Sequence, residues 1–174
     1  NIYRKAINIY PENSDLYANL SITFLRIGNI DHAKDYAEKA IHLNPDSAIA
    51  NSVLSSVFKF LNDLSEAKKY ILKSIELEPN NANYILDLSS IYRDLGDISK
   101  AYDSCLKAIK MQPELSNAYS ILGVIQRDLG RFIEAKNSLL KAIEIEPNNE
   151  IYFLNLSAIY IDIGDLFNAE ILIR

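Results

Sequence analysis

The sequence predicts an all-α protein built from repeated helical hairpins, and three observations support that prediction. The five prolines recur every 34 residues, at positions 11, 45, 79, 113 and 147. Three further positions keep one residue type in every copy: Leu at 20, 54, 88, 122 and 156; Ala at 33, 67, 101, 135 and 169; Ile at 7, 41, 75, 109 and 143. Four of the five glycines share another position, at 28, 96, 130 and 164. A fixed period of this length indicates a solenoid of stacked repeats.

Each repeat is expected to contain two helices, as the third repeat illustrates. Residues 82–95 carry apolar side chains at helical spacing. Gly96 follows where a helix end favours a left-handed residue, and Asp97 is then placed to be the N-cap of the next helix. That second helix is expected over residues 98–111. It ends before Pro113, because proline disfavours helix in the residue that precedes it.

The period divides the chain in order from its first residue to its last. Residues 1–13 are expected to be the end of a preceding repeat, and residues 150–174 a partial repeat. The complete repeats are residues 14–47, 48–81, 82–115 and 116–149. We expect all of them to form a single solenoid over residues 1–174. Because both ends fall inside a repeat, we also expect this chain to be part of a longer array or of a multidomain protein.

The repeat resembles that of the tetratricopeptide repeat (TPR) family, whose 34-residue pattern contains an aromatic residue, Leu, Gly, Tyr, Ala and Pro. The first complete repeat carries the pattern as Tyr17, Leu20, Phe24, Gly28, Ala33, Ala40 and Pro45. The fourth carries it as Tyr119, Leu122, Gly123, Gly130, Ala135, Ala142 and Pro147. The chain departs from the pattern after the Leu, where Ser replaces Gly in all but one repeat. The resemblance implies a TPR solenoid, a right-handed alpha-alpha superhelix.

Composition excludes several classes of protein. A net charge of −5 argues against a nucleic-acid-binding module, and the short apolar runs exclude a membrane span. With no signal peptide visible and only one cysteine, a small secreted disulfide scaffold is also excluded, and we expect a cytoplasmic location.

No motif indicates catalysis, so we expect a protein that is not an enzyme and has no cofactor and no metal site. His32 and His42 are ten residues apart, which is not a same-face spacing on a helix, and we interpret both as solvated. Cys105 occupies a core position of the repeat and is interpreted as a buried, inert thiol.

The resemblance implies that the first helices of successive repeats line a concave groove that binds a peptide or a helix of a partner protein. We expect the partner-binding residues to be Asn19, Arg26, Val53, Lys59, Leu86, Asp87, Arg93, Ile121, Val124, Arg127, Leu154 and Asn155. The apolar members would form a floor edged by mixed charge. An alternative for the arginines is that each pairs with an aspartate of the neighbouring repeat and only ties the stack together.

The residues at these positions do not match two binding modes known in the family. The lysines and asparagines that clamp a chaperone carboxylate are missing, since Ala18, Ile22, Ser52 and Ser56 stand there. The asparagine ladder of the O-linked N-acetylglucosamine transferases is kept only at Asn19 and Asn155.

We therefore expect a non-enzymatic scaffold for protein–protein interaction. The alternative is the substrate-recruiting TPR region of a larger enzyme, such as an O-linked glycosyltransferase. End-to-end self-association through the open ends is a further expectation.

Overall fold

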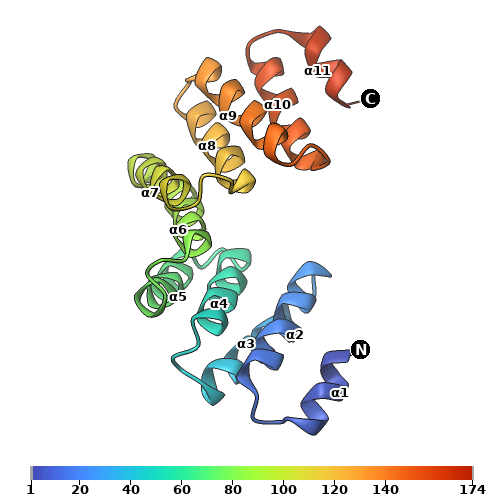
Figure 1. Ribbon diagram of the computed structural model, residues 1–174, viewed down its shortest axis with the longest axis vertical. Coiled ribbons are helices and arrows are strands. Elements are labelled where there is room, and N and C mark those ends of the chain that lie inside the picture. Colours follow the sequence, from blue (N-terminus) through green and yellow to red (C-terminus); the bar gives the residue numbers. More distant parts are fainter. Residues whose placement is uncertain (1, 174) are drawn as a thin grey trace. The chain divides into compact units, whose positions relative to one another are not determined.

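The computed structural model describes residues 2–173, which form antiparallel helical hairpins joined by short turns (Figure 1). It divides into two compact units, of which the first ends at Tyr84 and the second begins at Ile85. The all-α fold of consecutive hairpins is thus confirmed. The extent of the solenoid as a single domain stays a prediction.

The first unit contains five helices and the start of a sixth. They are α1 (Ile2–Ile9), α2 (Ser14–Arg26), α3 (Ile30–Leu43), α4 (Ala48–Phe60) and α5 (Leu64–Leu77). Helix α2 packs on α3 and α4 packs on α5, while α3 and α2 each also contact α4. The buried cluster between these helices consists of Leu20, Phe24, Ala33, Ala37, Val53, Leu54 and Val57.

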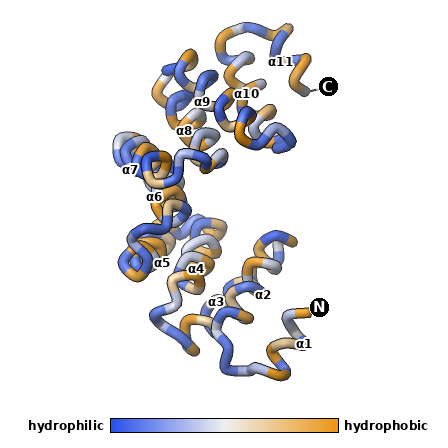
Figure 2. The backbone as a smooth tube through the Cα atoms, in the orientation of Figure 1, coloured by the Kyte–Doolittle hydropathy of each residue, from blue (hydrophilic) through white to orange (hydrophobic). Residues whose placement is uncertain are grey.

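The second unit holds most of α6 (Ala82–Asp94) and the five helices that follow it. These are α7 (Ile98–Met111), α8 (Ser116–Asp128), α9 (Phe132–Ile145), α10 (Glu150–Asp162) and α11 (Leu166–Ile173). Helix α8 packs on α9 and α10 packs on α11, and α8 and α10 also contact each other. Along their length the helices alternate between hydrophobic and hydrophilic residues, as amphipathic helices in a stack must (Figure 2).

The helix boundaries agree with the sequence signals. Helix α7 spans the predicted residues, and α6 ends one residue before the predicted end. Gly96 has a φ of 80°, in the left-handed region, and Asn62 takes the same role in the second repeat with a φ of 60°. Asp97 caps α7, since its Oδ1 accepts a hydrogen bond of 3.2 Å from the backbone N–H of Lys100.

A repeated buried hydrogen bond joins the two helices of a hairpin. In four repeats a serine Oγ donates to the backbone carbonyl of the alanine twelve residues later. The pairs are Ser21–Ala33 at 2.6 Å, Ser55–Ala67 at 2.7 Å, Ser89–Ala101 at 2.6 Å and Ser157–Ala169 at 3.3 Å. Both small residues of each pair are buried, which confirms that the helices approach closely there.

In the fourth repeat the two helices pack together without this serine hydrogen bond. Gly123 replaces the serine, and the side chain of Leu139 occupies the space beside it. A Cβ at position 123 would lie 2.8 Å from the Leu139 Cγ and 3.1 Å from the Ala135 carbonyl oxygen. Nearby, Ser138 Oγ donates a buried 2.6 Å hydrogen bond to Gln126 Oε1. The fourth hairpin therefore has the side chain of Leu139 beside Gly123 in place of a serine hydroxyl, whereas the second repeat keeps Ser55 together with a buried Ile71 at the position of Leu139.

Candidate interaction surface

All the predicted partner-binding residues lie on the first helices of the repeats, α2 and α4 in the first unit and α6, α8 and α10 in the second. Their accessibility differs widely. Val53 is only 5% exposed and Leu86 only 2%. Val53 belongs to the buried cluster of the first unit.

Two members of the expected apolar floor therefore need correction. Val53 and Leu86 fill the interior of the helix stack and present almost no surface to a partner. A charged substitution at either residue would bury a charge and damage the fold rather than report on binding. Among the other expected residues of the first three repeats, Arg26 and Asp87 are exposed, and Asn19, Lys59 and Arg93 are half-buried.

The predicted arginines of the second unit are engaged with aspartates of the following repeat. The Arg93 Nε lies 3.5 Å from Asp128 Oδ2. Arg127 forms a two-point hydrogen bond with Asp162, in which its Nε donates to Oδ2 and its Nη2 donates to Oδ1 at 3.1 Å. This contact lowers the pKa of the Asp162 carboxyl below its ordinary value, chiefly through the hydrogen bond from Arg127. The structure confirms that these charges tie neighbouring repeats together.

The predicted asparagine of the last repeat is also engaged. Asn155 Nδ2 donates a 3.1 Å hydrogen bond to the Oγ of Ser120 on α8. Sequence reasoning missed this bond, although the two positions are 35 residues apart, the same offset as Arg127 and Asp162. A residue on one first helix thus regularly meets the residue 35 positions later on the next.

Several apolar side chains of α8 and α10 are also accessible on this face. Leu154 is 57% exposed, and Ile151 and Ile161 on the same helix are similarly exposed. On the adjacent helix α8, Ile121 and Val124 are half-buried. We define these five residues as the apolar strip of α8 and α10. Its arrangement suits the burial of apolar side chains of a bound segment, since the charged groups beside it are already neutralised in pairs.

The histidine and cysteine side chains of the described residues lie apart from one another and in ordinary packing environments. Within residues 2–173 no group of three or more His, Cys, Asp and Glu side chains comes together as metal ligands would. Cys105 is buried, its thiol donates to the Ala118 carbonyl at 3.2 Å, and burial raises its pKa to about 12. The ring of His32 stacks on Phe24 with ring centres 5.0 Å apart. None of the helices in this part of the chain is long and apolar enough to span a bilayer.

The fold and this surface define a helical-hairpin repeat protein, and sequence comparison identifies its family. Models of the tetratricopeptide repeat match residues 49–81, 82–115 and 116–149, and a further one matches residues 2–35. The chain belongs to the tetratricopeptide repeat family. No curated protein sequence matches it.

Solved structures agree with this assignment at the level of the fold. TTC0263, a thermophilic TPR protein of Thermus thermophilus, is 20% identical with a TM-score of 0.85, over 91% of this chain and 87% of that one. PilF of Pseudomonas aeruginosa is 22% identical with a TM-score of 0.78, over 93% and 74%. YrrB, a TPR protein described as having an unusual peptide-binding site, is 19% identical with a TM-score of 0.65, over 99% and 89%.

Proposed function

We propose that this chain is a non-enzymatic protein-interaction scaffold whose apolar strip of α8 and α10 binds an extended or helical segment of a partner protein. The observation that carries the proposal is the exposure of Ile151 on α10, at a position that is also exposed at Ile49, Asn83 and Asn117 of the other repeats, beside the half-buried Ile121 and Val124 of α8. Repeat proteins of this kind present extended surfaces for binding.

The chemistry of the face favours apolar anchors over a charged ligand. Arg93 and Arg127 already pair with Asp128 and Asp162, so an acidic peptide would have to displace those carboxylates. Burying one large aliphatic side chain stabilises a complex by about 1.5–3 kcal/mol. Two or three anchors therefore offset much of the cost of ordering a short segment.

The description of YrrB as a protein with a peptide-binding site supports this class of function. Asn19, Arg26, Lys59 and Asp87 stay predicted contacts, and the cytoplasmic location stays a prediction as well.

Selection of binders from a phage-displayed library of random peptides tests the proposal. Peptides selected on the wild-type chain are re-tested on the variant Leu154→Glu, which places a carboxylate within the strip. Leu140→Glu is the matched control, because Leu140 is an exposed leucine on the second helix α9 of the fourth repeat.

We expect the selected peptides to carry two or more spaced apolar residues. Their affinity should fall at least tenfold with Leu154→Glu and stay unchanged with Leu140→Glu. Equal binding to wild type and Leu154→Glu would place the binding site elsewhere.

A further inference from the structure

A second apolar surface lies on the turns between the two helices of the last hairpins, away from the strip of α8 and α10. The residue after the start of each second helix is polar in three repeats, where it is Asp31, Ser65 or Ser99. In the last two repeats it is Ile133 and Phe167, which are 80% and 73% exposed. The packing of the repeat does not require an apolar residue here, because the other repeats do without one.

Three more exposed residues surround this pair and complete what we call the turn-edge patch. The patch consists of Leu129, Ile133, Ile163, Leu166 and Phe167, all in the second unit. At roughly 150–200 Å² for a large side chain, their exposed fractions leave an apolar area on the order of 500 Å². A standard interface buries about 800 Å² on each partner, of which about 60% is apolar. The patch supplies that apolar share almost completely.

The patch contains a hollow as well as a projection. Gly130, Phe132, Ile133 and Ile163 line a depression of about 370 Å³ between the two turns, with Arg131 and Glu134 at its rim. The depression is open to solvent, and its volume is larger than that of an enclosed apolar cavity of about 150 Å³ that binds benzene, so its size admits a phenyl ring. Phe167 projects from the same patch, four residues after Ile163. A surface that carries both a projection and a matching hollow can pair with a copy of itself.

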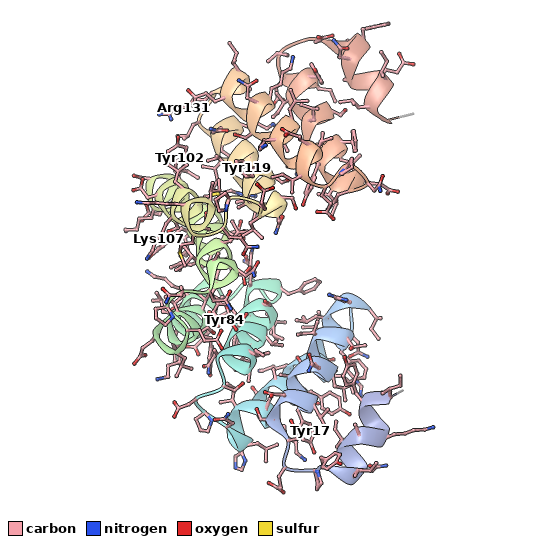
Figure 3. All side chains as sticks on the ribbon, viewed as in Figure 1. Tyr17, Tyr84, Tyr102, Lys107, Tyr119 and Arg131 are labelled. Carbon is pink, nitrogen blue, oxygen red and sulfur yellow. The ribbon has the colours of Figure 1, made fainter. Side chains whose placement is uncertain are left out.

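The charges at the rim are balanced, which also favours a second copy of the chain. Arg131 Nη1 lies 3.8 Å from Glu134 Oε2, and both side chains are about half exposed. The Arg131 guanidinium also lies over the ring of Tyr102, 5.6 Å from its centre (Figure 3). The rim thus holds one cation and one anion at adjacent positions. A two-fold axis that passes between these two positions would place Arg131 of each copy opposite Glu134 of the other.

We propose that the turn-edge patch is a two-fold interface between two copies of this chain, in which Phe167 of each copy enters the hollow of the other. The interface is distinct from the apolar strip and does not depend on the function proposed for it. Its closed symmetry limits assembly to a dimer, in contrast to end-to-end stacking of repeats, which is open-ended.

Sedimentation equilibrium on the purified chain, from about 1 to 100 µM, tests this interface. We expect the apparent mass to rise from 19.7 kDa toward twice that value and no further. The double variant Ile133→Ser/Phe167→Ser introduces the residue that the second and third repeats carry, so the fold should be kept. It should weaken dimerisation at least tenfold, with unchanged helical circular dichroism. Ile27→Ser is the control, because Ile27 is an equally exposed turn residue of the first repeat.

A charge exchange provides a second, independent readout. Arg131→Glu alone and Glu134→Arg alone should each weaken self-association, since like charges would meet across the axis. An equimolar mixture of the two variants should restore it as a mixed dimer, because every facing pair is then opposite in sign. A wild-type chain that stays monomeric to 100 µM, masses beyond the dimer, association unaffected by Ile133→Ser/Phe167→Ser, or a mixture that fails to associate would each overturn the proposal.

Discussion

The replacement of serine by glycine at position 123 gives the sharpest test of how the hairpins close. The substitution Gly123→Ser restores the residue found at the equivalent position of the other repeats, and by the repeat pattern alone it should stabilise the protein. The structure predicts the opposite. A Cβ at this position would stand 2.8 Å from the Leu139 Cγ, well inside contact distance. Overpacking of this kind costs about 1–3 kcal/mol, which exceeds the gain of about 0.5 kcal/mol in helix propensity.

The effect of Gly123→Ser on stability should change from destabilising to stabilising once Leu139 is replaced by alanine. Leu139→Ala alone is expected to cost about 2–5 kcal/mol by leaving a cavity. The first repeat shows the resulting combination, with Ala37 at the position of Leu139 and Ser21 donating to the Ala33 carbonyl. Adding Gly123→Ser to Leu139→Ala should therefore recover about 1–1.5 kcal/mol through helix propensity and the new hydrogen bond to the Ala135 carbonyl.

Urea unfolding followed by circular dichroism measures all four proteins of this cycle. The expected coupling between the two sites is about 2–3 kcal/mol, at the upper end of what contacting residues show. Additive effects, or a stabilising Gly123→Ser in the wild-type background, would refute the assignment of Leu139 as the residue that replaces the serine.

Four further predictions concern the buried contacts between paired helices, one ion pair and the cysteine thiol. Ser89→Ala removes the hydroxyl that donates to Ala101 and should cost about 1 kcal/mol in urea unfolding, whereas Ser90→Ala on the same helix should cost less than half of that. Ala101→Leu or Ala135→Leu, each at a fully buried position, should cost about 1–3 kcal/mol, and an unchanged melting temperature would mean that the helix pairing is wrong. Because Arg127 lowers the pKa of Asp162, the pair stabilises the fold above the ordinary carboxyl pKa and is lost as the pH falls through the lowered one. The melting temperature of Asp162→Asn should thus lie below that of wild type at pH 7, and the two should converge as the pH falls below the lowered pKa of Asp162. With its pKa raised to about 12, Cys105 should resist a thiol reagent at pH 8 and react only when urea unfolds the chain; rapid reaction in buffer would show that it is accessible.

Most of the fold follows from the sequence because the same residue types recur at the helix boundaries of successive repeats. A proline before each first helix, a left-handed residue after it and, in every repeat but the fourth, a capping residue beyond the turn fix the boundaries locally. Gly96 and Asp97 behave as predicted for this reason. The small residues at each helix crossing predict a close approach. They do not predict that a serine hydroxyl reaches across it, which depends on the separation of the helices.

The candidate site was less predictable. Position in the repeat identifies the helix face but not the accessibility of a side chain, so Val53 and Leu86 were expected in a groove and lie in the core. The pairing of Arg127 with Asp162 follows from a regular offset of 35 residues and could be anticipated as one of two alternatives. The turn-edge patch was missed although its signal is present in the sequence. Only a comparison of Ile133 and Phe167 with the polar residues of the other repeats reveals it.

We propose that the apolar strip of α8 and α10 receives the partner segment. The most direct test is titration of the isotopically labelled chain with a selected peptide, following backbone amide shifts by NMR. We predict that the largest changes fall on residues 121–124 and 151–161. Changes confined to the second helices α9 and α11, or to the turns between helices, would contradict it.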